Sequence, residues 1–387
     1  MSTAIIFPFY LIQQPNILNR GVVVVAVKKP ATIQLVLAAA VVSWGLSVYL
    51  HHPSVEGNVY SDVASFWWRE PYLREGLVPC IQYFFEYPPA SCFIVYAARL
   101  AGGPPLESYY MAFSALSLPA YLLLAWALTR LAGRVGAFFI LMPSMVVYGI
   151  YNFDHFFTAL LAASLVVFMD GRHRLAYFLL GMAFSVKLFT VLLLPVYLME
   201  RGRRMRNVLE GFGFFAVGAL PATAPVLATN PAWVAEFLNY HMSWGLENAW
   251  TVWLSADPFS PSAKVVGYLT TAVLLLRSYT SHAGLTMKSF LVFSSWLLGS
   301  PTFTPQMAIW LIPFAAAAPR LWVWVPLFET VNAAIIYTWF TTSIPTYPWT
   351  LPQTMSLIRA SALAVMWFTI YRNQTNISAF AVPGGKT

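Results

Sequence analysis

Residues 59–90 read VYSDVASFWWREPYLREGLVPCIQYFFEYPPA, and they form the only long segment before Asn230 that is neither an apolar run nor a short basic link. The segment combines many aromatic residues with six charged ones: Asp62, Arg69, Glu70, Arg74, Glu75 and Glu86. Because apolar runs lie on both sides of it, the pattern predicts a loop held between membrane helices. Charge is scarce in the rest of the chain, so we look here first for chemistry.

The composition excludes an ordinary soluble protein. Hydrophobic residues make up 59% of the chain and charged residues only 9%, whereas about a quarter of the residues in a soluble domain are charged. Apolar runs of roughly 20 residues recur along the whole length, and each is long enough to cross a bilayer as a helix. The sequence therefore predicts an all-α polytopic integral membrane protein with about twelve transmembrane helices.

The net charge of +8 is better explained by membrane topology than by nucleic-acid binding, since no basic cluster with interleaved aromatics is present in the sequence. We expect a cytoplasmic or interfacial segment over residues 1–30 and a first module over 31–228, with its first external loop at 51–108. A second large external loop at 229–262, C-terminal transmembrane helices over 263–371 and a cytoplasmic tail over 372–387 complete the prediction.

Two choices decide this topology. Residues 88–100 are too short to span a bilayer and contain Arg99, so we expect a helix lying at the outer interface. Residues 176–198 carry Lys187 at their middle, where a lone charge would be costly in lipid, so we divide them into two short arms with Lys187 at the outer turn. Most Lys and Arg then lie inside together with both chain termini, and most acids lie outside.

Five side chains at the outer face are candidates for a site, and each has an alternative structural explanation. Asp62 is either a general base with a pKa raised by burial or a solvated loop acid. Glu86 is either a positioned supporting carboxylate or part of a helix start, and Asp154 is either a supporting carboxylate or a helix N-cap. Lys187 could bind a lipid phosphate or could extend to the membrane interface. Gln306 could bind the same phosphate or could cap a helix.

The remaining candidates are weaker. His241 is a further candidate for phosphate binding, and Asn152, His155, Arg74 and Trp250 are candidates for substrate binding, although interfacial aromatic belts are the commoner use of tryptophan. The chain has no zinc spacing, phosphate-binding glycine loop or nucleophile elbow. Cys80 and Cys92 could close the first loop as a disulfide, or Cys92 could be buried as a free thiol on the interfacial helix.

In this order, the motifs resemble those of the superfamily C glycosyltransferases (GT-C), membrane enzymes that take sugar from a polyprenyl-phosphate donor. The resemblance covers about residues 31–320 and includes segments similar to glycosyltransferase family 87 and to the GPI mannosyltransferase I type. Its short motifs are Tyr60-Ser61-Asp62-Val63, Glu86-Tyr87-Pro88-Pro89, Gly149-Ile150-Tyr151-Asn152-Phe153-Asp154, Gly181 through Lys187, and Thr304-Pro305-Gln306 through Pro313.

The resemblance implies an inverting transfer of a hexose, mannose first among the candidates, to a hydroxyl on the extracytoplasmic face. Asp62 would act as the base, and Lys187, Gln306 and His241 would stabilise the lipid phosphate that leaves. The acceptor could be a glycan, a glycolipid or a protein, with membrane lipid around the site. Ala64 stands where an Asp-x-Asp motif would place a second acid, so no cofactor is expected to be required, although a divalent cation at Asp62 and Asp154 stays open.

A transporter or lipid flippase is the alternative from another class, since it would also be polytopic and apolar. Such proteins commonly contain inverted repeats or broken mid-membrane helices, and no internal repeat is detectable in this sequence. A non-catalytic scaffold would leave the concentration of acids on one face unexplained.

Overall fold

The computed structural model describes residues 30–379, and the regular elements in this part of the chain are all helices joined by loops, without a β-strand. The α-helices are α1 (Pro30–His51), α2 (Asp62–Arg69), α3 (Pro71–Glu75), α4 (Pro89–Gly102), α5 (Leu106–Ala132), α6 (Gly136–Ile140), α7 (Pro143–Tyr148), α8 (Asp154–Met169), α9 (His173–Val186), α10 (Leu194–Arg201), α11 (Met205–Thr229), α12 (Trp233–Ser243), α13 (Pro261–Tyr279), α14 (Leu285–Gly299), α15 (Ile312–Ala316), α16 (Val325–Trp339) and α17 (Leu351–Ala379). Short 3-10 helices are η1 (Gly133–Val135), η2 (Leu188–Leu192), η3 (Trp250–Leu254), η4 (Pro305–Leu311) and η5 (Pro319–Leu321).

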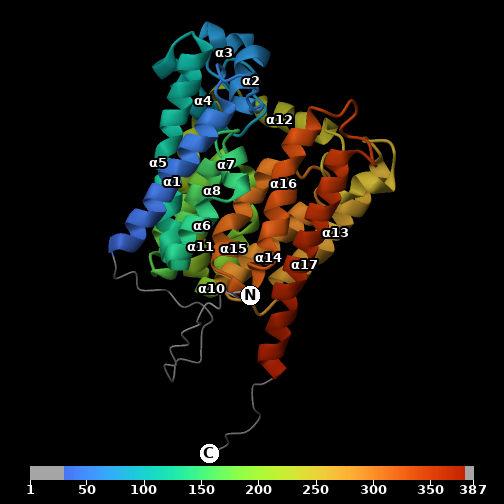
Figure 1. Cartoon of the computed structure of the whole chain (residues 1–387). Helices are drawn as coiled ribbons and strands as arrows, with labels where there is room; N and C mark the ends of the chain where they lie inside the picture. Colours follow the sequence, from blue (N-terminus) through green and yellow to red (C-terminus); the bar gives the residue numbers. More distant parts are fainter. Residues whose placement is uncertain (1–29, 380–387) are drawn as a thin grey trace, which may run out of the picture.

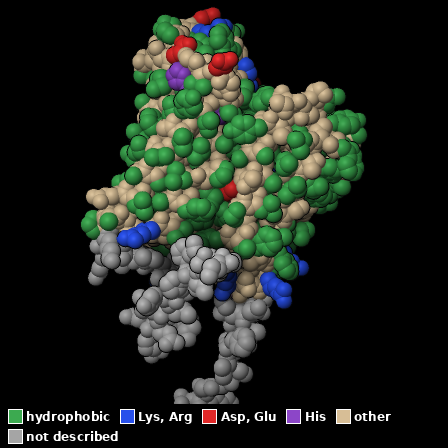
Figure 2. Space-filling view, viewed as in Figure 1, with side chains coloured by type: hydrophobic (Ala, Val, Ile, Leu, Met, Phe, Trp, Pro, Cys, Tyr) green, Lys and Arg blue, Asp and Glu red, His purple; other side chains and the backbone are tan. Residues whose placement is uncertain are grey.

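The predicted all-helical class is confirmed for the described residues. Four stretches are long and apolar enough to cross a membrane: Pro30–His51, Leu106–Ile140, Met205–Thr229 and Leu351–Asn373. Hydrophobic side chains cover the middle of the molecular surface, while Lys and Arg side chains gather toward its two ends (Figure 2). This distribution is that of an integral membrane protein. The number of twelve crossings stays a prediction.

The long helices form a bundle, and the first loop projects from one end of it. Helices α2 and α3 lie beyond that end of the bundle, whereas α10 lies at the opposite end (Figure 1). One hydrophobic core joins the N-terminal and C-terminal halves, with members from Val36 to Ile370. The predicted boundaries at 228 and 263 therefore divide the sequence into segments that share this core.

Helix α4 begins at the two prolines that follow Glu86 and Tyr87, where the sequence offered a helix start. Pro88 is its N-cap in an extended conformation (φ −61°, ψ 160°), and Pro89 occupies the first helical position, which tolerates proline because the amide there has no helical partner. With 14 residues, α4 is too short for a standard membrane crossing. Its position at the outer membrane interface remains a prediction.

The predicted break at Lys187 is confirmed. Helix α9 ends at Val186, Lys187 takes an extended conformation (φ −147°, ψ 124°), and the chain continues through η2 into α10. Two further apolar segments, 135–150 and 307–319, are divided into short helices. The first is divided into η1, α6 and α7, and the second into η4 and α15. Pro143 and Pro313 each remove a helical N–H near these divisions.

Residues 1–29 lie outside the described residues, and with them almost all of the predicted N-terminal segment. At the other end, α17 continues to Ala379, so the predicted tail from residue 372 starts as helix. Residues 380–387 again lie outside the described part.

Candidate active site

Asp62 occupies the first turn of α2, at the open end of the bundle. Ser61 caps this helix by accepting a hydrogen bond from the Ala64 amide at 3.3 Å, as N-cap serines do. The Val63 amide donates to the Tyr151 carbonyl at 3.3 Å, and the Phe66 ring stacks on Phe153 with centroids 5.9 Å apart. These contacts fix the start of α2 against the segment that precedes α8.

Three donors converge on the Asp62 carboxylate. Tyr60 donates its hydroxyl to Oδ1 at 3.1 Å, while Tyr87 and Asn152 donate to Oδ2 at 2.8 and 3.2 Å. Burial raises the pKa of Asp62, and the negative charge of Glu86 raises it further, against the donors. A carboxylate with a raised pKa that stays partly accessible to solvent has the properties of a general base.

A buried ion pair lies next to Asp62. Lys187 Nζ lies 3.3 Å from Asp154 Oδ2, and Trp310 Nε1 donates to Asp154 Oδ1 at 2.5 Å. The Lys187 ammonium also lies 4.9 Å from the centroid of the Tyr87 ring, within range for a cation–π interaction. Because Tyr87 contacts both Asp62 and Lys187, one side chain joins the candidate base to the candidate phosphate-binding cation.

Asn152 connects the two acidic groups. Its Oδ1 accepts from the Asp154 amide at 3.1 Å, and its Nδ2 donates to Asp62. Asn152, Asp154 and Lys187 are all buried, at 7% relative exposure or less. Asp62, Asn152, Asp154 and Lys187 are candidates from three separate parts of the sequence, and the fold brings them into one hydrogen-bonded cluster.

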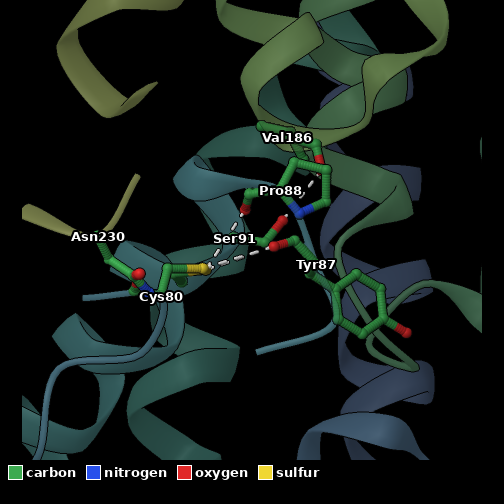
Figure 3. Close-up of a disulfide and its surroundings, with 7 residues drawn as sticks. Cys80, Tyr87, Pro88, Ser91, Val186 and Asn230 are labelled. Atoms are coloured by element: carbon green, nitrogen blue, oxygen red, sulfur yellow. Dashed lines mark hydrogen bonds between the residues drawn. A yellow bond between two sulfur atoms is a disulfide. The ribbon is translucent and has the colours of Figure 1, made fainter. Parts of the chain in front are cut away.

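The sequence left open whether Cys80 and Cys92 form a disulfide. The structure contains this bond, and the two Cα atoms are 6.1 Å apart. Figure 3 shows this link between the first loop and α4, together with two further attachments. Ser91 donates to the Val186 carbonyl at 3.1 Å, and Asn230 donates to the Cys80 carbonyl at 3.1 Å. The first loop is therefore fixed to the residue before Lys187 and to the end of α11.

Glu86 lies at the edge of this cluster. It forms an ion pair with Arg69 at 2.9 Å and accepts a short hydrogen bond from the Tyr240 hydroxyl of α12. His241 follows Tyr240, and its ring packs on Phe237 with centroids 4.1 Å apart. Burial lowers the pKa of His241, so an imidazolium at neutral pH is disfavoured there. Glu86 thus joins the first loop to the second.

Gln306 is buried in η4, the 3-10 helix that also carries Trp310. Asn332 donates to the Pro305 carbonyl at 2.9 Å and so fixes the start of this element. Within residues 30–379 the Gln306 amide makes no direct hydrogen bond to the Asp62 cluster. Its connection to the cluster is the shared short helix.

Glu247 is a residue that sequence reasoning missed. Burial raises the pKa of Glu247 to about 7, and the negative charge of Asp62 adds to this shift. The Glu247 amide donates to the Pro301 carbonyl at 3.0 Å, and the Phe303 amide donates to the Glu247 carbonyl at 2.9 Å. Its only sequence signal was its place in Glu247-Asn248-Ala249-Trp250, within the predicted second external loop.

Three predicted substrate-binding residues make their contacts outside the Asp62 cluster. Arg74 is exposed on α3 and lies 5.9 Å over the Trp68 ring. Trp250 donates its indole N–H to the Leu298 carbonyl at 2.6 Å. His155 adjoins Asp154 in sequence, but its buried ring packs against Phe156 with centroids 4.2 Å apart.

The donor set does not fit a divalent cation at Asp62 and Asp154. Both Asp154 oxygens face N–H groups, from Trp310 and Lys187, and a metal would have to displace them. Three protein donors already reach Asp62. In the part of the chain that the structure describes, no three His, Cys, Asp or Glu side chains are grouped to hold a metal ion.

Comparison with known proteins gave a family and similar solved structures. The sequence model of glycosyltransferase family 87 matches residues 84–301. The chain is similar to the crystal structure of ArnT from Cupriavidus metallidurans bound to undecaprenyl phosphate, with 16% identity and a TM-score of 0.48, over 90% of this chain and 78% of that one. The apo state of the same ArnT gave 17% identity and a TM-score of 0.47, over 88% and 76%. No curated protein matches the sequence.

Proposed function

The chain belongs to glycosyltransferase family 87, and on that premise we propose that it moves a hexose, mannose first among the candidates, from a polyprenyl-phosphate donor to a hydroxyl acceptor. Membership of a glycosyltransferase family favours this enzyme over the transporter considered from composition. The observation that carries the proposal is the cluster in which Asp62, Tyr87 and Asn152 adjoin the Asp154–Lys187 ion pair.

In the proposed reaction, the acceptor oxygen attacks the sugar C1 from the side opposite the phosphate, with inversion. The new bond joins that oxygen to C1, and the bond between C1 and the phosphate oxygen breaks. The bonding electrons leave with the lipid phosphate, and the proton of the acceptor hydroxyl passes to Asp62. The raised pKa of Asp62 suits this proton transfer, because a carboxylate of ordinary pKa would be a weaker base.

Lys187 would stabilise the charge that develops on the departing phosphate. Its ammonium has three donors, and only one side of it faces Asp154. The ion pair and the Tyr87 ring hold the cation in place before the reaction, so little reorganisation is needed in the transition state. Gln306 would add an amide donor, because its side chain has no hydrogen bond of its own to lose within the described residues. Asn152 would orient Asp62.

We place the reaction on the extracytoplasmic face, with both termini inside and about twelve crossings. The Cys80–Cys92 disulfide supports this side for the first loop, since disulfides persist in oxidising compartments. The short external loops favour a lipid-borne acceptor over a folded protein. His241 and Arg74, which are exposed, stay proposals for outer contacts with the donor or acceptor, whereas the buried His155 ring and the Trp250 indole, which donates to Leu298, could affect binding only indirectly.

The decisive variant is Asp62→Asn, which keeps the shape of the side chain and removes the base. We expect transfer from a labelled polyprenyl-phosphate hexose to fall at least about a hundredfold, while the purified protein still binds the donor. Asp257→Asn, which changes an exposed aspartate of the second loop, is the matched control. Near-normal turnover by the Asp62 variant would remove this residue from the role of base.

A further inference from the structure

A basic cavity lies at the end of the bundle opposite Asp62, where α9 and α11 begin and α10 ends. Its volume is about 510 Å³, and its lining includes Arg172, Arg174, Arg201, Arg204 and Arg206. Figure 1 places α10 at this end, and Figure 2 shows Lys and Arg side chains gathered there. The only carboxylate in the lining is Glu210.

The positive charge in this cavity is far from neutralised. Glu210 pairs with Arg174 at 2.8 Å and with Arg201 at 3.0 Å through the same oxygen. The other three lining arginines, Arg172, Arg204 and Arg206, form no ion pair within residues 30–379. These three side chains are exposed, so solvent weakens their mutual repulsion, and they remain available to an anion that enters the hollow.

Two buried side-chain nitrogens in the lining also lack a hydrogen-bond partner in the described chain. Nη1 of Arg201 and Nδ1 of His173 are each buried without a hydrogen-bond partner among the described residues. A buried polar nitrogen without a partner costs free energy, so such atoms call for an explanation. A ligand with several acceptor oxygens in the cavity would satisfy the guanidinium nitrogen directly.

The backbone contributes to the same charge. Helix α9 begins at His173 with Arg172 as its N-cap, and α11 begins at Met205 with Arg204 as its N-cap, in both cases without a side-chain cap. The unpaired amides and the positive ends of the α9 and α11 dipoles therefore meet at the cavity, where the carbonyl end of α10 offsets part of their charge. Helix N-termini combined with guanidinium groups are a recurrent arrangement for phosphate.

We propose that this cavity binds a phosphate-bearing anion, separately from any donor or acceptor at the Asp62 site. The chemistry that would be recognised is a phosphate group with at least two charged or polar oxygens, either in the headgroup of an anionic phospholipid or as free phosphate. Arg204 and Arg206 supply charge-assisted hydrogen bonds, and Arg201 supplies the buried donor. The inference does not depend on the sugar-transfer reaction.

The test uses the purified full-length chain in detergent, with native mass spectrometry after adding phosphatidylglycerol or phosphatidylcholine. The double variant Arg204→Gln/Arg206→Gln should bind phosphatidylglycerol at least about tenfold more weakly than the original protein. The matched control is Arg203→Gln/Arg134→Gln, which removes the same charge from two exposed arginines outside the cavity lining. It should change the affinity less than about twofold. Equal thermal unfolding temperatures in both variants would exclude a loss of folding.

Inorganic phosphate separates the two sources. Displacement of phosphatidylglycerol by millimolar phosphate, or phosphate-dependent thermal stabilisation that the Arg204/Arg206 variant loses, would support free phosphate as the ligand. Selective retention of phosphatidylglycerol in the presence of phosphate would support a lipid headgroup. The proposal is overturned if both lipids bind alike and phosphate has no effect, or if the control variant weakens binding as much as the cavity variant.

Discussion

At the scale of single residues, the candidate site is a group of carboxylates whose environments differ. Asp62 is held by three donors, Asp154 by an ammonium and an indole, and Glu247 makes no direct side-chain hydrogen bond in the described chain. The pKa of Asp62 is raised mainly by burial, and that of Glu247 is raised to about 7 by burial and by Asp62. The two carboxyl groups therefore lie in different environments, and Glu247 is largely neutral below pH 7.

This difference predicts a pH profile. As pH rises, kcat/KM should increase while Asp62 ionises at its raised pKa, and then decrease by roughly five- to tenfold above about pH 7, because an ionised Glu247 repels the anionic donor. Glu247→Gln should keep the increase and lose the decrease. Kinetics with the labelled donor between pH 5 and 9 measure both limbs.

Glu236→Gln, in the same loop but exposed, is the control for this profile and should keep both limbs. A Glu247 variant with an unchanged alkaline limb would show that another group causes the decrease.

At the scale of elements, α9 determines the position of Lys187, and its packing on α11 depends on glycine. A Cβ atom at Gly181 would lie 1.9 Å from the Phe215 carbonyl oxygen, and one at Gly218 would lie 2.0 Å from the Phe178 carbonyl oxygen. The two backbones therefore approach each other more closely than any side chain would allow, as small residues permit in membrane helices. Ser91 attaches the far end of α9 to α4.

Two substitutions of glycine by alanine on α11 should change the free energy of unfolding in opposite directions. Gly218→Ala forces the helices apart and should lower the free energy of unfolding by about 1–3 kcal/mol, with a loss of activity as Lys187 moves. Gly213→Ala meets nothing within 4 Å and should stabilise the protein by about 0.5–1 kcal/mol through helix propensity. Thermal unfolding of the two purified variants in detergent gives the comparison. A Gly218 variant as stable as the original would contradict the close approach.

At the scale of the whole molecule, the two ends of the bundle have different chemistry. The end with α2 and α3 carries the acidic cluster and the disulfide, while the end with α10 carries the arginine-lined cavity. Helix α9 runs from one to the other, from His173 at the cavity to the break at Lys187. Such an asymmetry fits a protein with a fixed orientation in a membrane.

The oxidising environment proposed for the acidic end can be measured. Maleimide labelling of the denatured, unreduced protein should modify neither Cys80 nor Cys92, and labelling after reduction should modify both, since the chain has two cysteines. Cys80→Ser/Cys92→Ser should lose about 3 kcal/mol of stability, given the short loop that the bond closes. Two reactive thiols without reduction would contradict both the disulfide and the assignment of this side.

The sequence by itself determined the helical membrane class, the start of α4 at its prolines and the break at Lys187. These depend on local properties: the length of apolar runs, the missing N–H of proline and the cost of a charge in lipid. It also selected Asp62, Asn152, Asp154 and Lys187 as candidates. Only the tertiary structure joined them through Tyr87 and added Glu247, because the packing of distant helices decides which loop acid is buried beside another. The two helix starts that form the basic cavity were likewise visible only in three dimensions, since residues 172 and 204 look like ordinary basic links along the chain.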